Sequence, residues 1–221
     1  NARLEPGELD LNSLSLTDEL ANLLLSGQVT LEEADQRLTE IDAMPSPYGK
    51  LITGCSFGLS TGAFGMLMGA SWSEIFWSGL FGFVVYFWVL WSERSKRVAL
   101  MLEPVIAYVV AFLACVASRF FDPGINIPII ILSSVIIFVP GLALTMGLAE
   151  LSSRNMVSGT ARIMDAMMQL FKLYFGAFLG VATGFSLFGE NTYAPAESLP
   201  YWSTWLAVVL LGFGLVAIFR T

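Results

Sequence analysis

Six long apolar segments, separated by short polar stretches, make up most of the sequence after residue 49. They lie at about residues 50–68, 73–91, 98–118, 126–149, 162–185 and 201–219. A helix of about 18 or more mostly apolar residues is long enough to cross the hydrocarbon core of a bilayer. The pattern therefore predicts an all-α fold, a polytopic transmembrane helical bundle of about six spans.

The first 49 residues have a more polar pattern, with apolar positions at helical spacing. We expect one helix after Ser15 that ends at Gly27, and a second helix that begins with a capping box of Thr30 and Glu33. The apolar stripe of the second helix consists of Leu31, Ala34, Leu38 and Ile41. This short soluble helical segment is either a cap that rests on the membrane domain or a regulatory or partner-binding element.

Composition supports a membrane protein and excludes several other classes. Only 13% of the 221 residues are charged, against about a quarter in an ordinary soluble domain. Ten of the eighteen acidic residues lie in the first 49 residues, so the net charge of −7 belongs mainly to the soluble segment. Basic patches with interleaved aromatic residues are missing, so we expect no nucleic-acid partner. With no histidine and two cysteines in apolar segments, we expect no metal, no cofactor and no enzyme.

The positions of lysine and arginine predict the orientation, because short cytoplasmic loops collect basic residues. With a cytoplasmic N-terminus, only Arg119 falls in an outer loop. The basic residues on the inner side are Arg3, Arg37, Lys50, Arg94, Lys96, Arg97, Arg154, Arg162 and Arg220. The expected organisation is a cytoplasmic lead-in (1–49), a five-span membrane domain (50–185), an outer loop (186–200) and a last helix (201–221). The chain begins at Asn1 rather than methionine, so we expect a fragment or a processed chain.

Two segments carry glycine at intervals of four residues. These glycines are Gly54, Gly58 and Gly62 in the first segment, and Gly176, Gly180 and Gly184 in the fifth. Small residues at this spacing let helix backbones approach closely in lipid. We expect helix packing from them rather than chemistry.

The fourth segment is interrupted at Pro140-Gly141, about 18 Å along the helix from Pro128 and so near the middle of a core about 30 Å thick. Proline removes a helix hydrogen bond. Transporters use the backbone groups of broken helices to hold substrates and ions, although an ordinary proline kink is the alternative. Thr145 offers a hydroxyl on the same segment, as do Ser133 and Ser134, but such hydroxyls can also bond back to their own helix.

The fifth segment carries four polar side chains, Arg162, Asp165, Gln169 and Lys172. At about 100° per residue they share an arc of roughly 120° with the three glycines, so this face is expected to contact protein. We expect Arg162 or Lys172 to neutralise Asp165, and Lys172 to lie near mid-depth, where an unpaired ammonium is very unfavourable. The stripe either fixes helix register through ion pairs or forms a protonatable or substrate-binding face.

Two carboxylates lie near the inner ends of segments. Glu103, beside Pro104 at the start of the third segment, either reaches the membrane interface or couples transport to protons. Glu150 and Arg154 are expected to form a solvated pair at the inner end of the fourth segment.

The stretch VPGLALTMGLAELSSRNMVSGTARIMDAM resembles the threonine/serine exporter family of bacterial inner-membrane proteins. The positions that carry this resemblance are Val139-Pro140-Gly141, Glu150, Gly159, Arg162 and Ala166. SGQVTLEEADQRLTEI resembles the lead-in of the same family, through Gly27, Thr30, Glu33, Ala34, Leu38 and Ile41. Together with the glycine-rich first segment and Gly69 and Trp72, the resemblance covers about residues 10–185.

The resemblance implies five spans in this half, followed by a second, smaller membrane half that is fused or a separate subunit. Residues 201–221 are then the first helix of that second half, truncated here. The implied activity is export of threonine and serine across the bacterial inner membrane, driven by the proton-motive force. A related two-component system is associated with succinate export.

We therefore expect a secondary transporter, and an oligomer in the lipid bilayer, that exports small polar metabolites by proton antiport. Asp165 or Glu103 would carry the proton, while Lys172 and Arg162 would hold a carboxylate. The remaining pathway candidates are Gln169, Thr145 and the hinge at Pro140 and Gly141. The alternatives are a dicarboxylate (succinate) exporter subunit and a non-transporting scaffold subunit whose polar stripe pairs helices.

Overall fold

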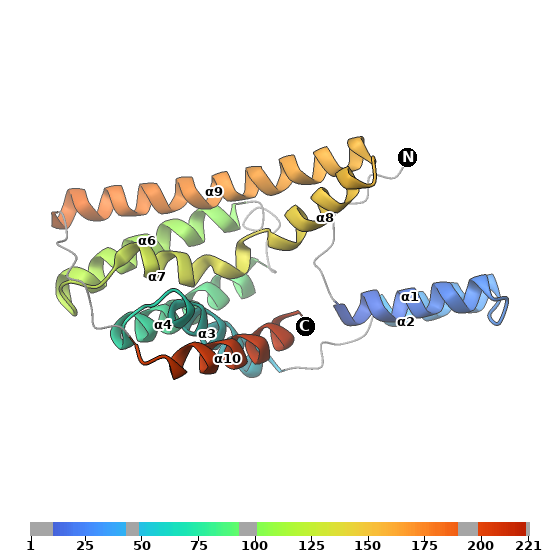
Figure 1. Cartoon of the computed structure of the whole chain (residues 1–221), viewed down its shortest axis with the longest axis horizontal. Coiled ribbons are helices and arrows are strands. Elements are labelled where there is room, and N and C mark those ends of the chain that lie inside the picture. The colour runs from blue at the N-terminus through green and yellow to red at the C-terminus, as the bar shows by residue number, and fades with distance from the viewer. Residues whose placement is uncertain (1–10, 43–48, 93–100, 190–198, 220–221) are drawn as a thin grey trace.

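The computed structural model describes residues 11–42, 49–92, 101–189 and 199–219, and its regular elements in these ranges are all helices (Figure 1). The soluble segment forms α1 (Leu11–Leu25) and α2 (Leu31–Asp42). The apolar part forms α3 (Lys50–Leu67), α4 (Trp72–Ser92), α6 (Leu102–Phe120), α7 (Ile127–Val135), the 3₁₀ turn η1 (Ile136–Phe138), α8 (Gly141–Ser152), α9 (Met156–Phe188) and α10 (Trp202–Ile218). The predicted all-α fold is confirmed.

The apolar helices form one bundle in which α7 is central. It contacts α3, α4 and α6, while α3 lies between α4 and α10, and α6 packs along α9. Along α7, Ile130, Ser133 and Ser134 are fully buried. At one end of the bundle, α8 and the first half of α9 extend past the other helices (Figure 1).

Length and apolarity single out α4, α6 and α9 as membrane-crossing helices, and α7–η1 with α8 makes a fourth if the bent pair counts as one span. The other two predicted segments are also helical. α10 has 17 residues, and α3 carries buried polar side chains such as Thr53, Ser56 and Thr61, which lower its hydropathy. The helical membrane bundle is thus confirmed, with α3 and α10 as its shorter or more polar members.

The glycines at four-residue spacing mark close helix contacts, as predicted. Gly54, Gly58 and Gly62 face α4, whereas Gly176, Gly180 and Gly184 face α6. A Cβ atom on Gly180 would lie 2.5 Å from the carbonyl oxygen of Tyr108. Only glycine therefore allows α6 and α9 to approach this closely.

A buried carboxylate joins the beginnings of α4 and α7. Glu74, which is 2% exposed, accepts hydrogen bonds from the backbone N–H groups of Ser71 (2.7 Å) and Asn126 (2.6 Å). Asn126 in turn caps α7 by accepting from the N–H of Ile129 (3.2 Å). Next to this group, Ser73 donates to the carboxylate of Asp122. The S-x-x-E spacing of Ser71 and Glu74 is that of a capping box.

The soluble segment is an antiparallel hairpin of α1 and α2. Gly27 has φ 73° after α1, and Glu33 accepts from the backbone N–H of Thr30 at 3.0 Å, so both predicted helix boundaries are confirmed. The N–H and hydroxyl of Thr30 lower the pKa of Glu33. α1 begins at Leu11, earlier than the predicted start after Ser15.

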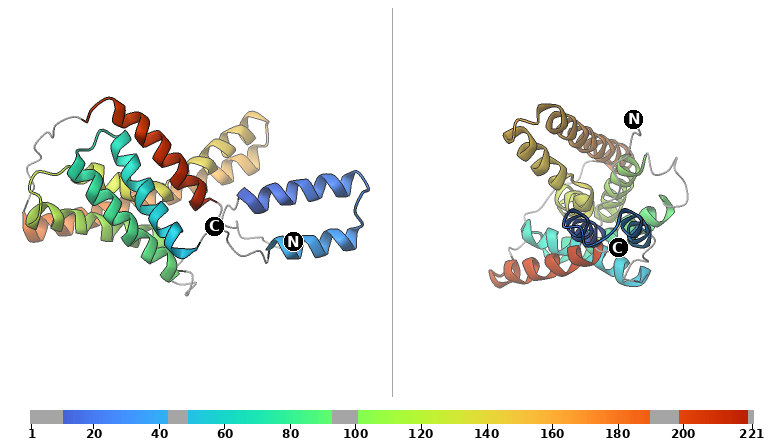
Figure 2. Two further views of the ribbon diagram at one scale, coloured as in Figure 1. Left: turned by 90° about the horizontal axis from the view of Figure 1, so that it is seen from below. Right: turned by 90° about the vertical axis from the view of Figure 1, so that its right-hand side faces the viewer.

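The prediction that this segment rests on the membrane domain as a cap is wrong. The two helices pack on each other, and the hairpin extends away from the bundle (Figure 2). Leu20 of α1 and Ala34 of α2 are buried between the two helices, whereas Leu31 and Leu38 of the predicted stripe are exposed. Parts of the predicted segments lie outside the described residues, namely 1–10, 43–48, 93–100, which include the start of the predicted segment 98–118, 190–198 of the predicted outer loop, and 220–221.

The close contact between α6 and α9 leads to a stability prediction. Gly180→Ala is expected to lower the free energy of unfolding by about 1–3 kcal/mol, because the added methyl overpacks a backbone contact. Thermal unfolding in detergent measures this loss. The matched control is Gly212→Ala on α10, where no heavy atom lies within 4 Å of the new methyl; an equal loss there would show that the helix contact is not the cause.

Candidate functional site

The apolar segment predicted at 126–149 is broken near its middle. α7 tightens into the turn η1, Val139 is extended (φ −71°, ψ 120°), and α8 begins at Gly141 with its axis turned by 61°. The predicted interruption at Pro140-Gly141 is therefore confirmed. Pro140 is buried, whereas Gly141 is exposed and has open space where a side chain would be.

A side chain from α9 satisfies one backbone group at this break. Val139 donates to the carbonyl of Ile136 (3.0 Å) and Gly141 to that of Val139 (2.8 Å). The carbonyl of Phe138 accepts a hydrogen bond from Nε2 of Gln169 at 3.1 Å. In lipid a carbonyl without a partner costs several kcal/mol, so Gln169 fixes α9 against the break.

One turn further along α9, Lys172 pairs with Glu103 at the start of α6. The ammonium lies 3.6 Å from Oε2 of Glu103, and the two side chains are 41% and 22% exposed. This distance is longer than a hydrogen bond, and Oε2 of Glu103 is buried without a hydrogen-bond partner. The pair is therefore a loose contact at the edge of the bundle.

A second ion pair joins α9 to α8, and it differs from both predicted pairs. Arg162 forms its ion pair with Glu150, at 3.0 Å, and not with Asp165. Glu150 therefore pairs with Arg162 and not with Arg154, its predicted partner. The cause is the hairpin of α8 and α9, in which Gly147 lies against Gly159. This close approach brings Glu150, one turn past Gly147, next to Arg162.

The prediction that Asp165 is neutralised within the stripe is wrong. Asp165 is exposed and forms no ion pair among the residues that the structure describes. The buried face of α9 is centred on Ala166, Leu173 and Gly180, and Asp165 lies about 80° around the helix from Leu173. Lys172 lies about 100° from Leu173, but its longer side chain reaches back to Glu103.

α9 is longer than the hydrocarbon core of a bilayer is thick. Its 33 residues begin at Met156 rather than 162 and measure about 50 Å, against a core of about 30 Å. Part of α9 therefore extends beyond the core. Arg162 and Asp165 lie on the part of α9 that extends past the bundle with α8 (Figure 1).

The hydroxyl candidates bond back to their own helices. Thr145 donates to the carbonyl of Leu142 (2.9 Å), and Ser133 and Ser134 donate to Ile129 and Ile130 (2.7 Å each). Thr145 is therefore not joined to the polar cluster. No group of His, Cys, Asp or Glu in the described ranges could hold a metal ion.

The structure thus brings together the break at Pro140-Gly141, Gln169 and the Lys172–Glu103 pair, with Arg162 further along α9. Asp165 and Thr145 do not belong to this group. Sequence reasoning missed Glu150 as the partner of Arg162, although both belong to the motif that carried the family resemblance. The helix hairpin that joins them could not be read from the spacing alone.

Comparison with known proteins agrees with this architecture. A family model described as "Putative threonine/serine exporter" matches residues 2–184. An uncharacterized protein of Schizosaccharomyces pombe is 22% identical over 191 residues, which are 82% of this chain and 22% of that protein. Pheromone-regulated membrane protein 10 of Yarrowia lipolytica is 27% identical over 177 residues, which are 78% of this chain and 14% of that protein.

This chain therefore spans less than a quarter of the length of either relative. Both relatives are fungal, so the bacterial inner membrane stays a prediction from the resemblance. No solved structure matches the chain. Because the family match covers most of its residues, this chain belongs to the threonine/serine exporter family of membrane proteins.

Proposed function

We propose that this chain is part of a secondary transporter that exports small polar metabolites, foremost threonine and serine, in exchange for protons. The observation that carries the proposal is the broken helix α7–α8, held by Gln169, with a loose carboxylate–ammonium pair one turn away. Membership of the exporter family supports the same conclusion.

The break offers donors and acceptors that suit an amino acid. α8 begins without a side-chain cap, and the free N–H groups of such a helix start attract a carboxylate. Carbonyl groups beside a break accept from an ammonium. An amino acid carries both groups on one carbon, so one break can bind both ends of its backbone.

The Lys172–Glu103 pair suggests how protons and substrate exchange. A substrate can enter this loose pair with its carboxylate on Lys172 and its ammonium on the ionised Glu103. When Glu103 takes up a proton, it no longer binds the ammonium, and the substrate leaves. The proton and the substrate ammonium thus compete for one carboxylate, which is the requirement for antiport. Glu103 is a better proton carrier than Asp165, because Asp165 is exposed and forms no ion pair in the described part of the chain.

The same contacts disfavour a dicarboxylate substrate, which would use two cations. Of the two cations on the α9 stripe, Arg162 is already bound to Glu150 at 3.0 Å, so Lys172 alone is loosely held. The scaffold alternative draws support from the fact that the two ion pairs tie α6, α8 and α9 together.

Counterflow in proteoliposomes tests the proposal directly. The full-length protein that contains this chain is reconstituted with any partner half, and uptake of labelled threonine is compared with that of labelled succinate. We expect threonine uptake that changes with an imposed pH gradient. Succinate uptake alone would point to a dicarboxylate exporter, and absence of both would favour the scaffold alternative.

Substitutions in the Lys172–Glu103 pair distinguish binding of the substrate from its coupling to protons. Lys172→Met is expected to lower threonine exchange at least about tenfold, because the substrate carboxylate loses its cation. Glu103→Gln is expected to keep exchange but to lose its dependence on the pH gradient. Asp165→Asn is the matched control and should behave as the unmodified protein. Normal gradient-driven export in Glu103→Gln would refute the assignment of Glu103.

Gln169→Leu tests the link between α9 and the break. It keeps a similar side-chain volume but removes the donor to the carbonyl of Phe138. We expect the initial rate of exchange to fall at least about tenfold, because the unpaired carbonyl changes the geometry of the break. Circular dichroism and insertion into the membrane should be unchanged. An unaltered rate would show that this hydrogen bond serves only helix packing.

A further inference from the structure

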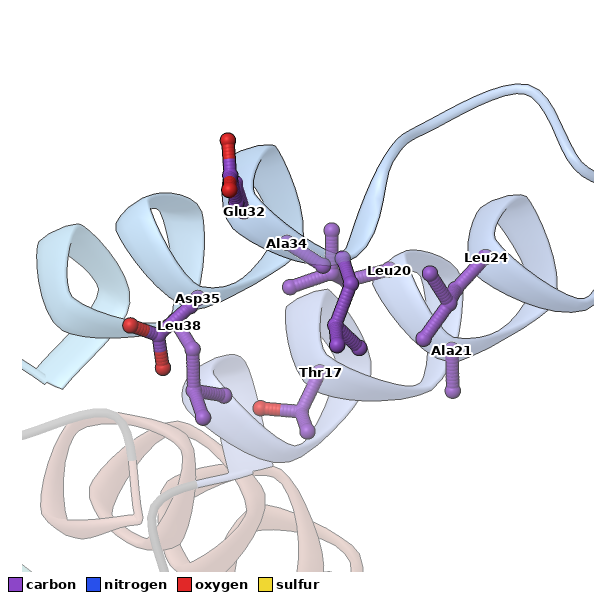
Figure 3. A pocket seen from close by; sticks show the side chains of 9 residues that line it. Thr17, Leu20, Ala21, Leu24, Glu32, Ala34, Asp35 and Leu38 are labelled. Atoms are coloured by element: carbon purple, nitrogen blue, oxygen red, sulfur yellow. The ribbon is translucent and has the colours of Figure 1, made fainter.

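The α1–α2 hairpin carries an apolar groove of about 550 Å³ between its two helices (Figure 3). Leu20 and Ala34 form its buried floor. Leu24 of α1 and Leu38 of α2 lie at opposite ends of the groove. The groove is therefore built by both helices, and it depends on the turn at Gly27 that brings them together.

The side chains around the groove expose more apolar surface than the fold of the hairpin requires. Leu31 is 76% exposed and Leu38 is 46% exposed, and both line the groove. The hairpin extends away from the bundle, so the membrane helices do not cover this surface (Figure 2). Contiguous apolar surface on a soluble element marks an interaction site.

The charges around the groove restrict what can cover it. Residues 11–42 contain seven acidic residues and a single basic one, Arg37, and the carboxylates of Glu32 and Asp35 line the groove itself. A second hairpin would bring two strongly negative surfaces together. An anionic membrane surface would repel the hairpin for the same reason. A positively charged partner fits both the apolar floor and the acidic edge.

We propose that this groove binds a short, basic, amphipathic helix of a partner protein. The lining residues run from Thr17 to Leu24 on α1 and from Leu31 to Leu38 on α2, so each wall is about 10 Å long, or two helical turns. A helix with apolar side chains at i, i+3 or i+4, and i+7 fills such a groove. Lysine and arginine on its flanks then face Glu32 and Asp35. The hairpin acts as a docking arm, and this role does not depend on the transport site.

The proposal is tested with a labelled peptide of about 14 residues, or four turns, in which leucine recurs at i, i+3, i+4 and i+7 and lysine fills the opposite face of the helix. It is titrated by fluorescence anisotropy against the full chain in zwitterionic nanodiscs, with empty nanodiscs as the reference. We expect a Kd of about 10 μM or tighter, and weaker binding as salt is added. A peptide of the same composition without an apolar face, and one with glutamate in place of lysine, should not bind.

Variants of the hairpin locate the binding site. Leu38→Ser and Leu31→Ser are expected to weaken binding at least about fivefold, and Asp35→Asn about two- to threefold with a smaller salt effect. Leu25→Ser and Glu19→Gln are the matched controls, because Leu25 is 86% exposed and neither residue lines the groove. Asp35→Asn changes an exposed side chain, so its effect does not depend on the folding of the leucine variants.

Several results would overturn the proposal. One is equal binding of the glutamate peptide, which would leave the acidic edge without a role. Another is an equal loss of binding in Leu25→Ser, which would place the peptide elsewhere. Self-association that is lost in Leu38→Ser would identify a second copy as the occupant, and binding of the hairpin to anionic vesicles would identify a lipid surface.

Discussion

Hydrocarbon offers no hydrogen-bond partner, so each backbone group released at Pro140 must find one inside the protein. This constraint explains why α9 takes the position it does. Its Gln169 satisfies the carbonyl of Phe138, and its glycines further along allow close contact with α6. A break in one helix thus requires a polar, closely packed neighbour, and the sequence of α9 meets both requirements on one face.

The two ion pairs of α9 have different physical characters. Arg162 and Glu150 are in hydrogen-bonding contact between α9 and α8, which suits a fixed connection within a hairpin. Lys172 and Glu103 are further apart, and the lysine is the more exposed of the two, whereas the facing Oε2 of Glu103 is buried without a hydrogen bond. A pair that forms and separates easily is the better candidate for exchange, whereas the tighter pair is better suited to holding the hairpin together.

Features that depend on local pattern could be predicted from the sequence. The apolar segments, the glycine faces, the interruption at Pro140 and the capping box at Thr30 each follow from residues close together in the chain. The partners of Arg162 and Lys172 could not be predicted, because they depend on how distant helices pack. The start of α9 at Met156 was missed because residues 156–161 are mostly small or weakly apolar and give little hydropathy signal.

The carboxylate of Glu74 has a mechanical consequence for the break. By accepting from Ser71 and Asn126, it connects the start of α7 to α4, and α4 in turn packs along α3. The part of the broken helix before Pro140 is thereby anchored to the bundle. α8 packs chiefly against α9, so a change of angle at the break would move α8 relative to an α7 that stays in place. The buried glutamate thereby determines which side of the break is held fixed.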